Sequence, residues 1–253
     1  NWEIETESDQ TLTSALRVKS SGVTGGIIRG SGARRTITQT ANEPIFEIDA
    51  STGLFQFQNL QLKNNFTGGT KTSGHGIEFV AGVSSSNPIS CFDCIFGDST
   101  DSLRMGIDGN TFNWSLNVMR CVFNNCQVGM IQTSGGGGLN ANIVESVFND
   151  SVAEGLYFSG AGDANLAGCI VSNSGGTGLY STSRVNVSDS VFYNNGGHGI
   201  STLGEQLAST VVNSVFVDNG SFGINSGVQS PMGLVADCSF FGNSSGQISK
   251  AGL

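Results

Sequence analysis

Short alternating runs of apolar and polar residues repeat along the chain at intervals close to 24 residues. Each repeat is anchored by a small residue two positions before a buried-type apolar residue, at Cys94, Cys121, Ser146, Cys169, Ser190, Ser214 and Cys238. Successive anchors are separated by 27, 25, 23, 21, 24 and 24 residues. A recurring period of this length is typical of a solenoid, in which each repeat forms one turn that stacks on the previous turn.

Each repeat contains three apolar runs separated by turns rich in Asn and Gly. One run precedes the anchor, as at Val185 and Val187, a second includes the anchor, and a third follows a glycine, as at Gly199-Ile200. The runs are too short for amphipathic helices, and their alternation directs one side chain inward and the next outward. Asn and Gly suit the corners because they tolerate left-handed backbone angles. The pattern predicts an all-β fold, a single-stranded right-handed parallel β-helix with three short strands per coil.

The repeat is weakest at the beginning of the chain. We therefore divide the sequence into irregular N-terminal coils, residues 1–43, and a regular parallel β-helix, residues 44–253, within one continuous domain. The abrupt start at Asn1 leads us to expect a mature or trimmed fragment. Two insertions, residues 66–73 and 98–104, lengthen neighbouring coils at the same corner. Insertions on one face of a solenoid often form its binding face, so we expect one wall of a groove there.

Charge limits the classes of partner. The formal net charge is −9, and only 12% of the residues are charged. An acidic chain does not suit nucleic acid or an anionic membrane surface, since both attract basic faces. No apolar run approaches the roughly 18 residues of a membrane-spanning helix, so no membrane insertion is expected.

The cysteines follow the repeat rather than a disulfide framework. Four of the six occupy the anchor position, where Ser alternates with Cys. This exchange predicts an inward stack of small side chains with free, buried thiols. Cys94 and Cys121 lie on adjacent coils and are close enough in principle to form a disulfide.

The outward position of the third run gives the candidate site. From coil to coil it is occupied by Glu47, Glu78, Asp108, Ile131, Tyr157, Tyr180, Ser201 and Asn225. Carboxylates on adjacent coils repel, so they bind a cation, share a proton or splay into water. A shared proton is the arrangement from which acid–base pairs arise, and paired carboxyl groups are what glycosidases use. We therefore predict Glu47, Glu78 and Asp108 as catalytic residues, without dividing the roles among them. Solvated surface charges and a metal site are the alternatives.

The two tyrosines in this column predict substrate binding. Tyr157 and Tyr180 lie on adjacent coils and offer flat faces for sugar rings.

The repeat carries a family resemblance. Residues 190–200, Ser-Val-Phe-Tyr-Asn-Asn-Gly-Gly-His-Gly-Ile, resemble the repeat of the pectin-lyase-like β-helix superfamily, and the resemblance covers about residues 45–250. The segment Arg29-Gly30-Ser31-Gly32 followed by Thr36-Ile37 is similar to the early coils of phage tailspikes and polysaccharide depolymerases. This likeness implies a trimeric spike, extracellular or on a virion surface, that binds and often cleaves polysaccharide.

Two enzyme groups of the superfamily resemble the chain in single short segments. Gly197-His198-Gly199 is similar to a polygalacturonase segment, but the Asp-Asp pair and the following Arg-x-Lys of that group are absent, which favours His198 as a corner residue. Pectate lyases bind calcium through an Asp cluster and use an Arg as base. Arg104 near Asp98, Asp101 and Asp108 is similar to this arrangement, so Arg104 and Asp101 are added as substrate-binding candidates.

These observations predict a polysaccharide-binding and polysaccharide-cleaving β-helix of a tailspike or extracellular depolymerase, either a glycoside hydrolase or a polysaccharide lyase. The alternative is a non-catalytic structural or adhesive protein of a surface or fibre. We expect a homo-oligomer, a trimer, and no resident metal or cofactor; calcium is the one ion that the pectate-lyase likeness suggests.

Overall fold

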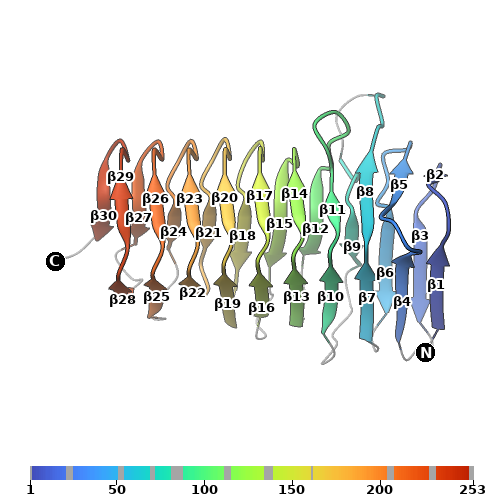
Figure 1. Cartoon of the computed structure of the whole chain (residues 1–253), viewed down its shortest axis with the longest axis horizontal. Helices are drawn as coiled ribbons and strands as arrows, with labels where there is room; N and C mark the ends of the chain where they lie inside the picture. Colours follow the sequence, from blue (N-terminus) through green and yellow to red (C-terminus); the bar gives the residue numbers. More distant parts are fainter. Residues whose placement is uncertain are drawn as a thin grey trace.

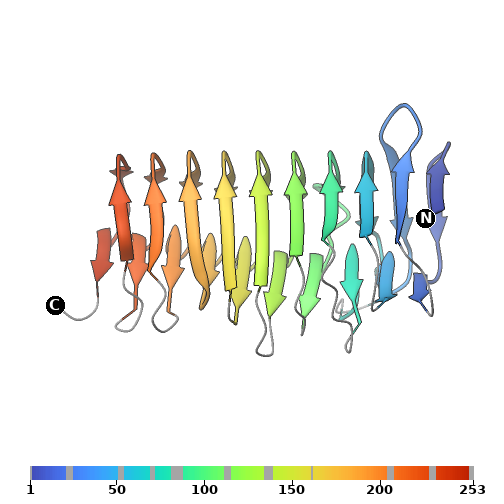
Figure 2. The same cartoon turned by 90° about the horizontal axis from the view of Figure 1, so that it is seen from below.

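The chain forms three parallel β-sheets that wind together into a solenoid without a described helix. The computed structural model describes residues 2–20, 25–50, 54–68, 72–80, 88–110, 115–133, 139–160, 162–203, 208–227 and 232–250. Each sheet contains ten strands, and every strand pairs with the strand three positions away in the chain order. Figures 1 and 2 show the coils side by side along the long axis, with the two termini at opposite ends. The predicted parallel β-helix is therefore confirmed.

The first sheet, sheet A, holds the run before the anchor. Its strands are β1 (Trp2–Thr6), β4 (Gly25–Gly30), β7 (Leu54–Gln58), β10 (Ile89–Phe92), β13 (Ser115–Met119), β16 (Leu139–Val144), β19 (Gly162–Ala167), β22 (Arg184–Ser188), β25 (Ser209–Val212) and β28 (Met232–Ala236).

Sheet B holds the run that follows the anchor. Its strands are β2 (Gln10–Leu12), β5 (Arg35–Gln39), β8 (Leu60–Asn64), β11 (Ile95–Phe96), β14 (Val122–Asn124), β17 (Val147–Asn149), β20 (Ile170–Ser172), β23 (Val191–Tyr193), β26 (Val215–Val217) and β29 (Ser239–Phe241).

Sheet C holds the run that follows the glycine. Its strands are β3 (Leu16–Ser20), β6 (Phe46–Ala50), β9 (Ile77–Phe79), β12 (Met105–Asn110), β15 (Val128–Thr133), β18 (Leu156–Ser159), β21 (Leu179–Ser181), β24 (Ile200–Thr202), β27 (Phe222–Ser226) and β30 (Gly246–Lys250).

The N-terminal strands join these same sheets. β1, β2 and β3 pair in parallel with β4, β5 and β6, so the first coils continue the register of the later ones.

Stacked aromatic rings fill the interior behind sheet B. Phe96, Phe123 and Phe148 occupy equivalent positions on adjacent coils, and their ring centroids are 4.4 and 4.5 Å apart. Phe192 and Phe216 repeat the arrangement at 5.1 Å. All five side chains are fully buried. Identical residues at one coil spacing thus pack on each other, and this packing fixes the register of all three sheets.

The anchor residues form the predicted inward stack. The backbone N–H of Cys121 donates to Ser146 Oγ at 3.1 Å, and that of Cys169 donates to Ser190 Oγ at the same distance. All six cysteines are free, and all but Cys238 are buried. The expectation of unpaired interior thiols is therefore confirmed, including for Cys94 and Cys121.

Asx residues shape the corners. Twelve described non-glycine residues have positive φ angles, and ten of them are Asn or Asp. These residue types tolerate the left-handed conformation because their short polar side chains form local hydrogen bonds. The two exceptions are Arg120 at 51° and Glu145 at 50°.

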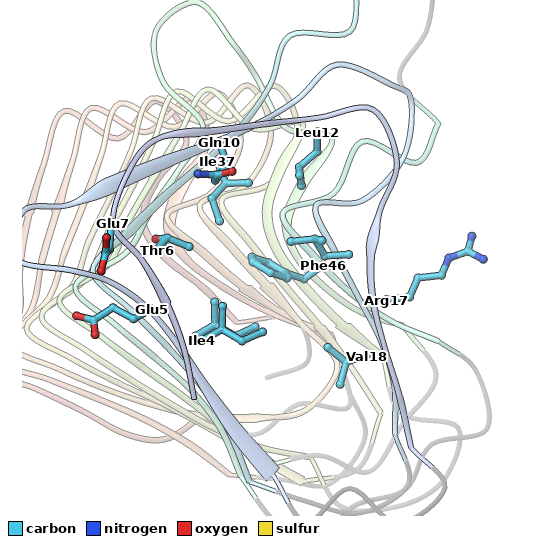
Figure 3. A pocket seen from close by; sticks show the side chains of 12 residues that line it. Ile4, Glu5, Thr6, Glu7, Gln10, Leu12, Arg17, Val18, Ile37 and Phe46 are labelled. Carbon is cyan, nitrogen blue, oxygen red and sulfur yellow. The ribbon is translucent and has the colours of Figure 1, made fainter. Parts of the chain in front are cut away.

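The N-terminal end of the core is hollow. A cavity of about 570 Å³ lies inside the first coil. Figure 3 shows Ile4, Leu12, Ile37 and Phe46 pointing into the coil, while Arg17 points away from it. Its lining combines the core residues Ile28, Ile37 and Phe46 with more exposed residues of the first coil, so the cavity lies at the N-terminal end of the solenoid interior. Among the described residues, no helix is long and apolar enough to cross a membrane.

Candidate functional site

The outward column on sheet C has the register that the sequence predicted. Glu47 pairs with Glu78, Glu78 with Asp108, and Asp108 with Ile131. The column continues through Tyr157, Tyr180, Ser201 and Asn225. The apolar neighbours of these positions, such as Ile77 and Ile107, are fully buried. The inward side chains therefore hold the outward ones in line along the molecule.

A histidine completes a compact cluster within this column. His75, Glu78 and Asp108 each place one ligand-type atom within 4.8 Å of the others. His75 Nε2 lies 3.6 Å from Asp108 Oδ2. His75 is only 2% exposed and Asp108 only 6%. The cluster thus combines an imidazole with two carboxyl groups in a place largely shielded from water.

Burial and crowding change the proton affinity of Glu78. Burial first, and then the negative charges of Asp108 and Glu47, raise the pKa of this carboxyl group to about 7. The positive charge of Arg104 acts in the opposite direction. Glu78 is therefore a carboxyl group that exchanges its proton near neutral pH, which is the property that acid–base chemistry requires.

His75 is held in its neutral form. Burial lowers the pKa of the imidazole to about 4, and the charge of Arg104 contributes in the same direction. Nδ1 is buried and has no hydrogen-bond partner. A neutral imidazole keeps one nitrogen with a free lone pair, so His75 can accept a proton or bind a metal ion.

Arg104 joins the cluster through the two predicted insertions. Its backbone N–H donates to the carbonyl of Gly74 at 2.9 Å, and its guanidinium donates to the carbonyl of Thr72. The insertion at 98–104 therefore meets the insertion at 66–73 beside the column, although residues 69–71 lie outside the described part. The predicted substrate-binding residue Arg104 is thus close to Glu78 and His75.

Glu47 and Asp101 are each engaged elsewhere. Glu47 Oε2 lies 3.1 Å from Arg17 Nε on the preceding coil, so its charge is balanced from the side away from Asp108. Asp101 lies 3.0 Å from Lys63 Nζ, which also contacts Asp98 at 3.4 Å. Of the three predicted catalytic carboxylates, the structure brings Glu78 and Asp108 together with His75 and leaves Glu47 paired with Arg17.

The tyrosines form a platform farther along the same face. The rings of Tyr157 and Tyr180 are 5.0 Å apart and 8° from parallel. Both side chains are half-buried, with Ile131 between them and Asp108 in the column. Burial raises the pKa of the Tyr180 hydroxyl, and the neighbouring Tyr157 and Glu154 add to this effect. The Tyr180 hydroxyl therefore stays protonated at neutral pH, and the platform presents aromatic surface on the same face as the acidic cluster.

His75 was not among the predicted site residues, although Gly74-His75-Gly76 immediately precedes the strand that carries Glu78. The second Gly-His-Gly segment behaves differently. His198 stacks on Phe222 at 5.9 Å, and its Nδ1 accepts a hydrogen bond from the Phe222 backbone N–H. His198 is thus a corner residue, as predicted. The insertion before His75, absent before His198, is the sequence signal that distinguishes the two.

A continuous outward column on a stacked, three-sheet solenoid defines the class of protein. Residues 105–252 match the family model of the right-handed β-helix region, which is 148 of 253 residues. The chain belongs to this right-handed β-helix family. No curated protein matches the sequence.

Solved structures are similar to the chain at low sequence identity. The A-module of the mannuronan C-5 epimerase AlgE4 from Azotobacter vinelandii superposes with a TM-score of 0.54 at 12% identity, covering 97% of this chain and 89% of that module. A single-substitution variant of the catalytic domain of a GH87 alpha-1,3-glucanase in complex with nigerose gives a TM-score of 0.41 at 12% identity, over 97% of this chain and 61% of that chain.

Proposed function

We propose that the chain is a polysaccharide-processing β-helix protein that binds a glycan along the outward face of sheet C. The observation that carries this proposal is the continuity of one column, in which the half-buried Glu78 and the buried Asp108 are followed by the stacked Tyr157 and Tyr180. Carboxyl pairs perform acid–base chemistry at glycosidic linkages, and aromatic faces bind apolar faces of ligands.

The spacing of the carboxyl groups restricts the reaction. Glu78 and Asp108 have oxygens within 4.8 Å of each other, which is too close for the separation of about 6.5–9.5 Å that inverting hydrolysis needs. Glu47 and Asp108 lie two rungs apart, at roughly 9.5 Å along the sheet, but Glu47 is paired with Arg17. The close pair suits retaining hydrolysis, in which one carboxyl group attacks the anomeric carbon while the other protonates the leaving oxygen, or proton abstraction from a sugar carbon.

The AlgE4 module, a fold relative with a TM-score above 0.5, is a mannuronan C-5 epimerase, which supports a polysaccharide as the substrate class. The resemblance of residues 29–37 to tailspikes supports a finer version of the proposal: a depolymerase or tailspike, extracellular or on a virion surface, that assembles as a trimer. The acidic net charge supports the expectation that nucleic acid is not a partner.

A non-catalytic adhesive protein is the second candidate. The stacked tyrosines favour it, because a rigid aromatic pair binds sugar rings without any chemical step. Binding without turnover is therefore the outcome that separates the two functions.

The test is to incubate the protein with uronate and neutral polysaccharides, including mannuronan, with and without divalent cations. Reducing-end release reports hydrolysis, absorbance of unsaturated ends reports elimination, and NMR of the polymer reports a change of configuration at C-5. We expect turnover that falls at least about a hundredfold in Asp108→Asn and in Glu78→Gln, the scale of losing a general acid or base.

The matched control is Asp237→Asn, an equally small change at an exposed corner away from sheet C. Full activity of the Asp237 variant with loss in the other two supports the enzyme. Glycan binding by the wild type without turnover on any polymer supports the adhesive protein instead. Activity that survives both Asp108→Asn and Glu78→Gln contradicts the proposed site.

A further inference from the structure

We propose that His75, Glu78 and Asp108 bind a divalent transition-metal ion such as Zn²⁺ or Mn²⁺. The three residues come from one turn of the solenoid and the next. His75 lies at the corner before β9, Glu78 lies within β9, and Asp108 lies at the paired position of β12. This inference does not depend on the proposed function, because metal binding can be measured without any glycan.

The distances fit a common ion. Ligand atoms about 2.1 Å from one metal ion are at most about 4.2 Å from each other. The separation of 3.6 Å between His75 Nε2 and Asp108 Oδ2 corresponds to an angle of roughly 120° at an ion placed at such bond lengths. The remaining ligand atom, from Glu78, lies within 4.8 Å of both. The flexible Glu78 side chain needs to move only slightly for its oxygen to reach the same ion.

The buried histidine is the observation that points to a ligand rather than to a simple acidic patch. His75 is 2% exposed, its Nδ1 has no hydrogen-bond partner, and its Nε2 lies 3.6 Å from Asp108 Oδ2. A buried polar group without a hydrogen bond costs free energy, of the order of 1–3 kcal/mol. Coordination would give the Nε2 lone pair a partner, and the proton of the neutral ring would then lie on Nδ1.

Charge balance supports the same assignment. Glu47, Glu78 and Asp108 place three carboxyl groups on consecutive rungs, and Arg17 balances the charge of Glu47 at one end of this row. A divalent ion would neutralise the Glu78–Asp108 pair. The positive charge of Arg104 acts against binding and limits the affinity, since it reaches both His75 and Glu78.

The ligand set selects the kind of ion. Calcium prefers six to eight oxygen ligands, whereas this cluster offers one imidazole nitrogen and two carboxyl groups. Imidazole with carboxylate suits zinc and manganese, and catalytic zinc sites use three protein ligands with an open position. The open position would accept water or a sugar oxygen.

The experiment is isothermal titration calorimetry of the chelator-treated protein with Zn²⁺, Mn²⁺ and Ca²⁺ at neutral pH, together with the visible absorption spectrum after Co²⁺ addition. We expect one Zn²⁺ or Mn²⁺ per chain, much weaker Ca²⁺ binding, and a Co²⁺ spectrum that reports nitrogen ligation. His75→Ala and Asp108→Asn should each weaken metal binding by more than about tenfold. Even the loss of a residue that only hydrogen-bonds to a metal ligand typically costs at least this much metal affinity.

His198→Ala is the matched control, because it removes the other histidine of the chain, also from a Gly-His-Gly corner. It should leave the affinity unchanged. Circular dichroism of each variant establishes that it is folded, and Glu78→Gln provides a third ligand substitution if His75→Ala fails to fold. Absence of Zn²⁺ and Mn²⁺ binding to the wild type overturns the proposal, as does equal loss in His75→Ala and His198→Ala. Metal binding without glycan turnover would support this metal site and contradict only the proposed enzymatic function.

Discussion

Tyr157 and Tyr180 stack almost parallel, with ring centroids 5.0 Å apart, on the face of the solenoid that also carries Asp108. The spacing equals one rung of the sheet, so the backbone register sets the geometry of the pair. Neither ring has to be ordered by a ligand. A rigid platform of this kind binds at little cost in conformational entropy.

The platform predicts the effect of removing one ring. Tyr157→Ala should weaken glycan binding about tenfold or more, equivalent to about 1.4 kcal/mol, because a buried aromatic contact is lost and its stacked neighbour becomes mobile. Calorimetry or affinity electrophoresis with the Asp108→Asn protein measures binding without turnover. Tyr193→Ala is the control, since Tyr193 is an exposed tyrosine on sheet B. Equal losses in the two variants would argue against a platform on sheet C.

The acidic cluster predicts how stability depends on pH in the presence of a chelator. The pKa of His75 falls from 6.5 to about 4 on folding, so the unfolded chain binds more protons between these values and stability rises with pH. The pKa of Glu78 rises from 4.5 to about 7, so the folded protein binds more protons there and stability falls with pH. The two effects oppose each other between about pH 4.5 and 6.5.

Single substitutions should separate these opposing effects. Relative to the wild type, Glu78→Gln should gain stability as pH rises from 4.5 to 7, and His75→Gln should lose stability as pH rises from 4 to 6.5. Urea unfolding at intervals from pH 4 to 8 measures both differences, and subtraction of the wild-type curve removes the contributions of other groups, among them Asp108, Glu47 and Arg104. Parallel curves of unfolding free energy against pH for all three proteins would contradict the pKa shifts of Glu78 and His75.

The corner before each anchor predicts a stabilising substitution. Glu145 has a φ angle of 50°, where equivalent corners hold Asn213 and Asp237. Because Asn tolerates this conformation better than Glu, Glu145→Asn should raise the free energy of unfolding by about 0.5–1 kcal/mol. Thermal or urea unfolding provides the measurement. Asp237→Asn exchanges one suitable residue for another and should change little; a gain no larger than in this control would refute the explanation.

The fold and the outward column could be predicted because both follow from one repeated register. Once the inward Phe and Ile positions are aligned, every outward residue from Glu78 to Asn225 is placed with no further information. His75 could not be placed in this way, because it follows an insertion where the period fails, and its contact with Asp108 depends on the conformation of that corner. The pairing of Glu47 with Arg17 was missed for a related reason: the repeat is faint before residue 44, although β3 and β6 are paired in register.

The anchors Ser190 and Ser214 stand 24 residues apart, and the backbone N–H of the first donates to the hydroxyl of the second. Deleting residues 190–213 would join Asp189 to Ser214 and recreate the same corner dipeptide. The distal end would then move inward by one rung, about 4.8 Å, with the cluster around Glu78 untouched. Deleting a single residue would instead reverse inside and outside in its strand. The molecule can therefore lengthen or shorten only in whole coils. The length of ligand that it can contact changes in steps of one coil.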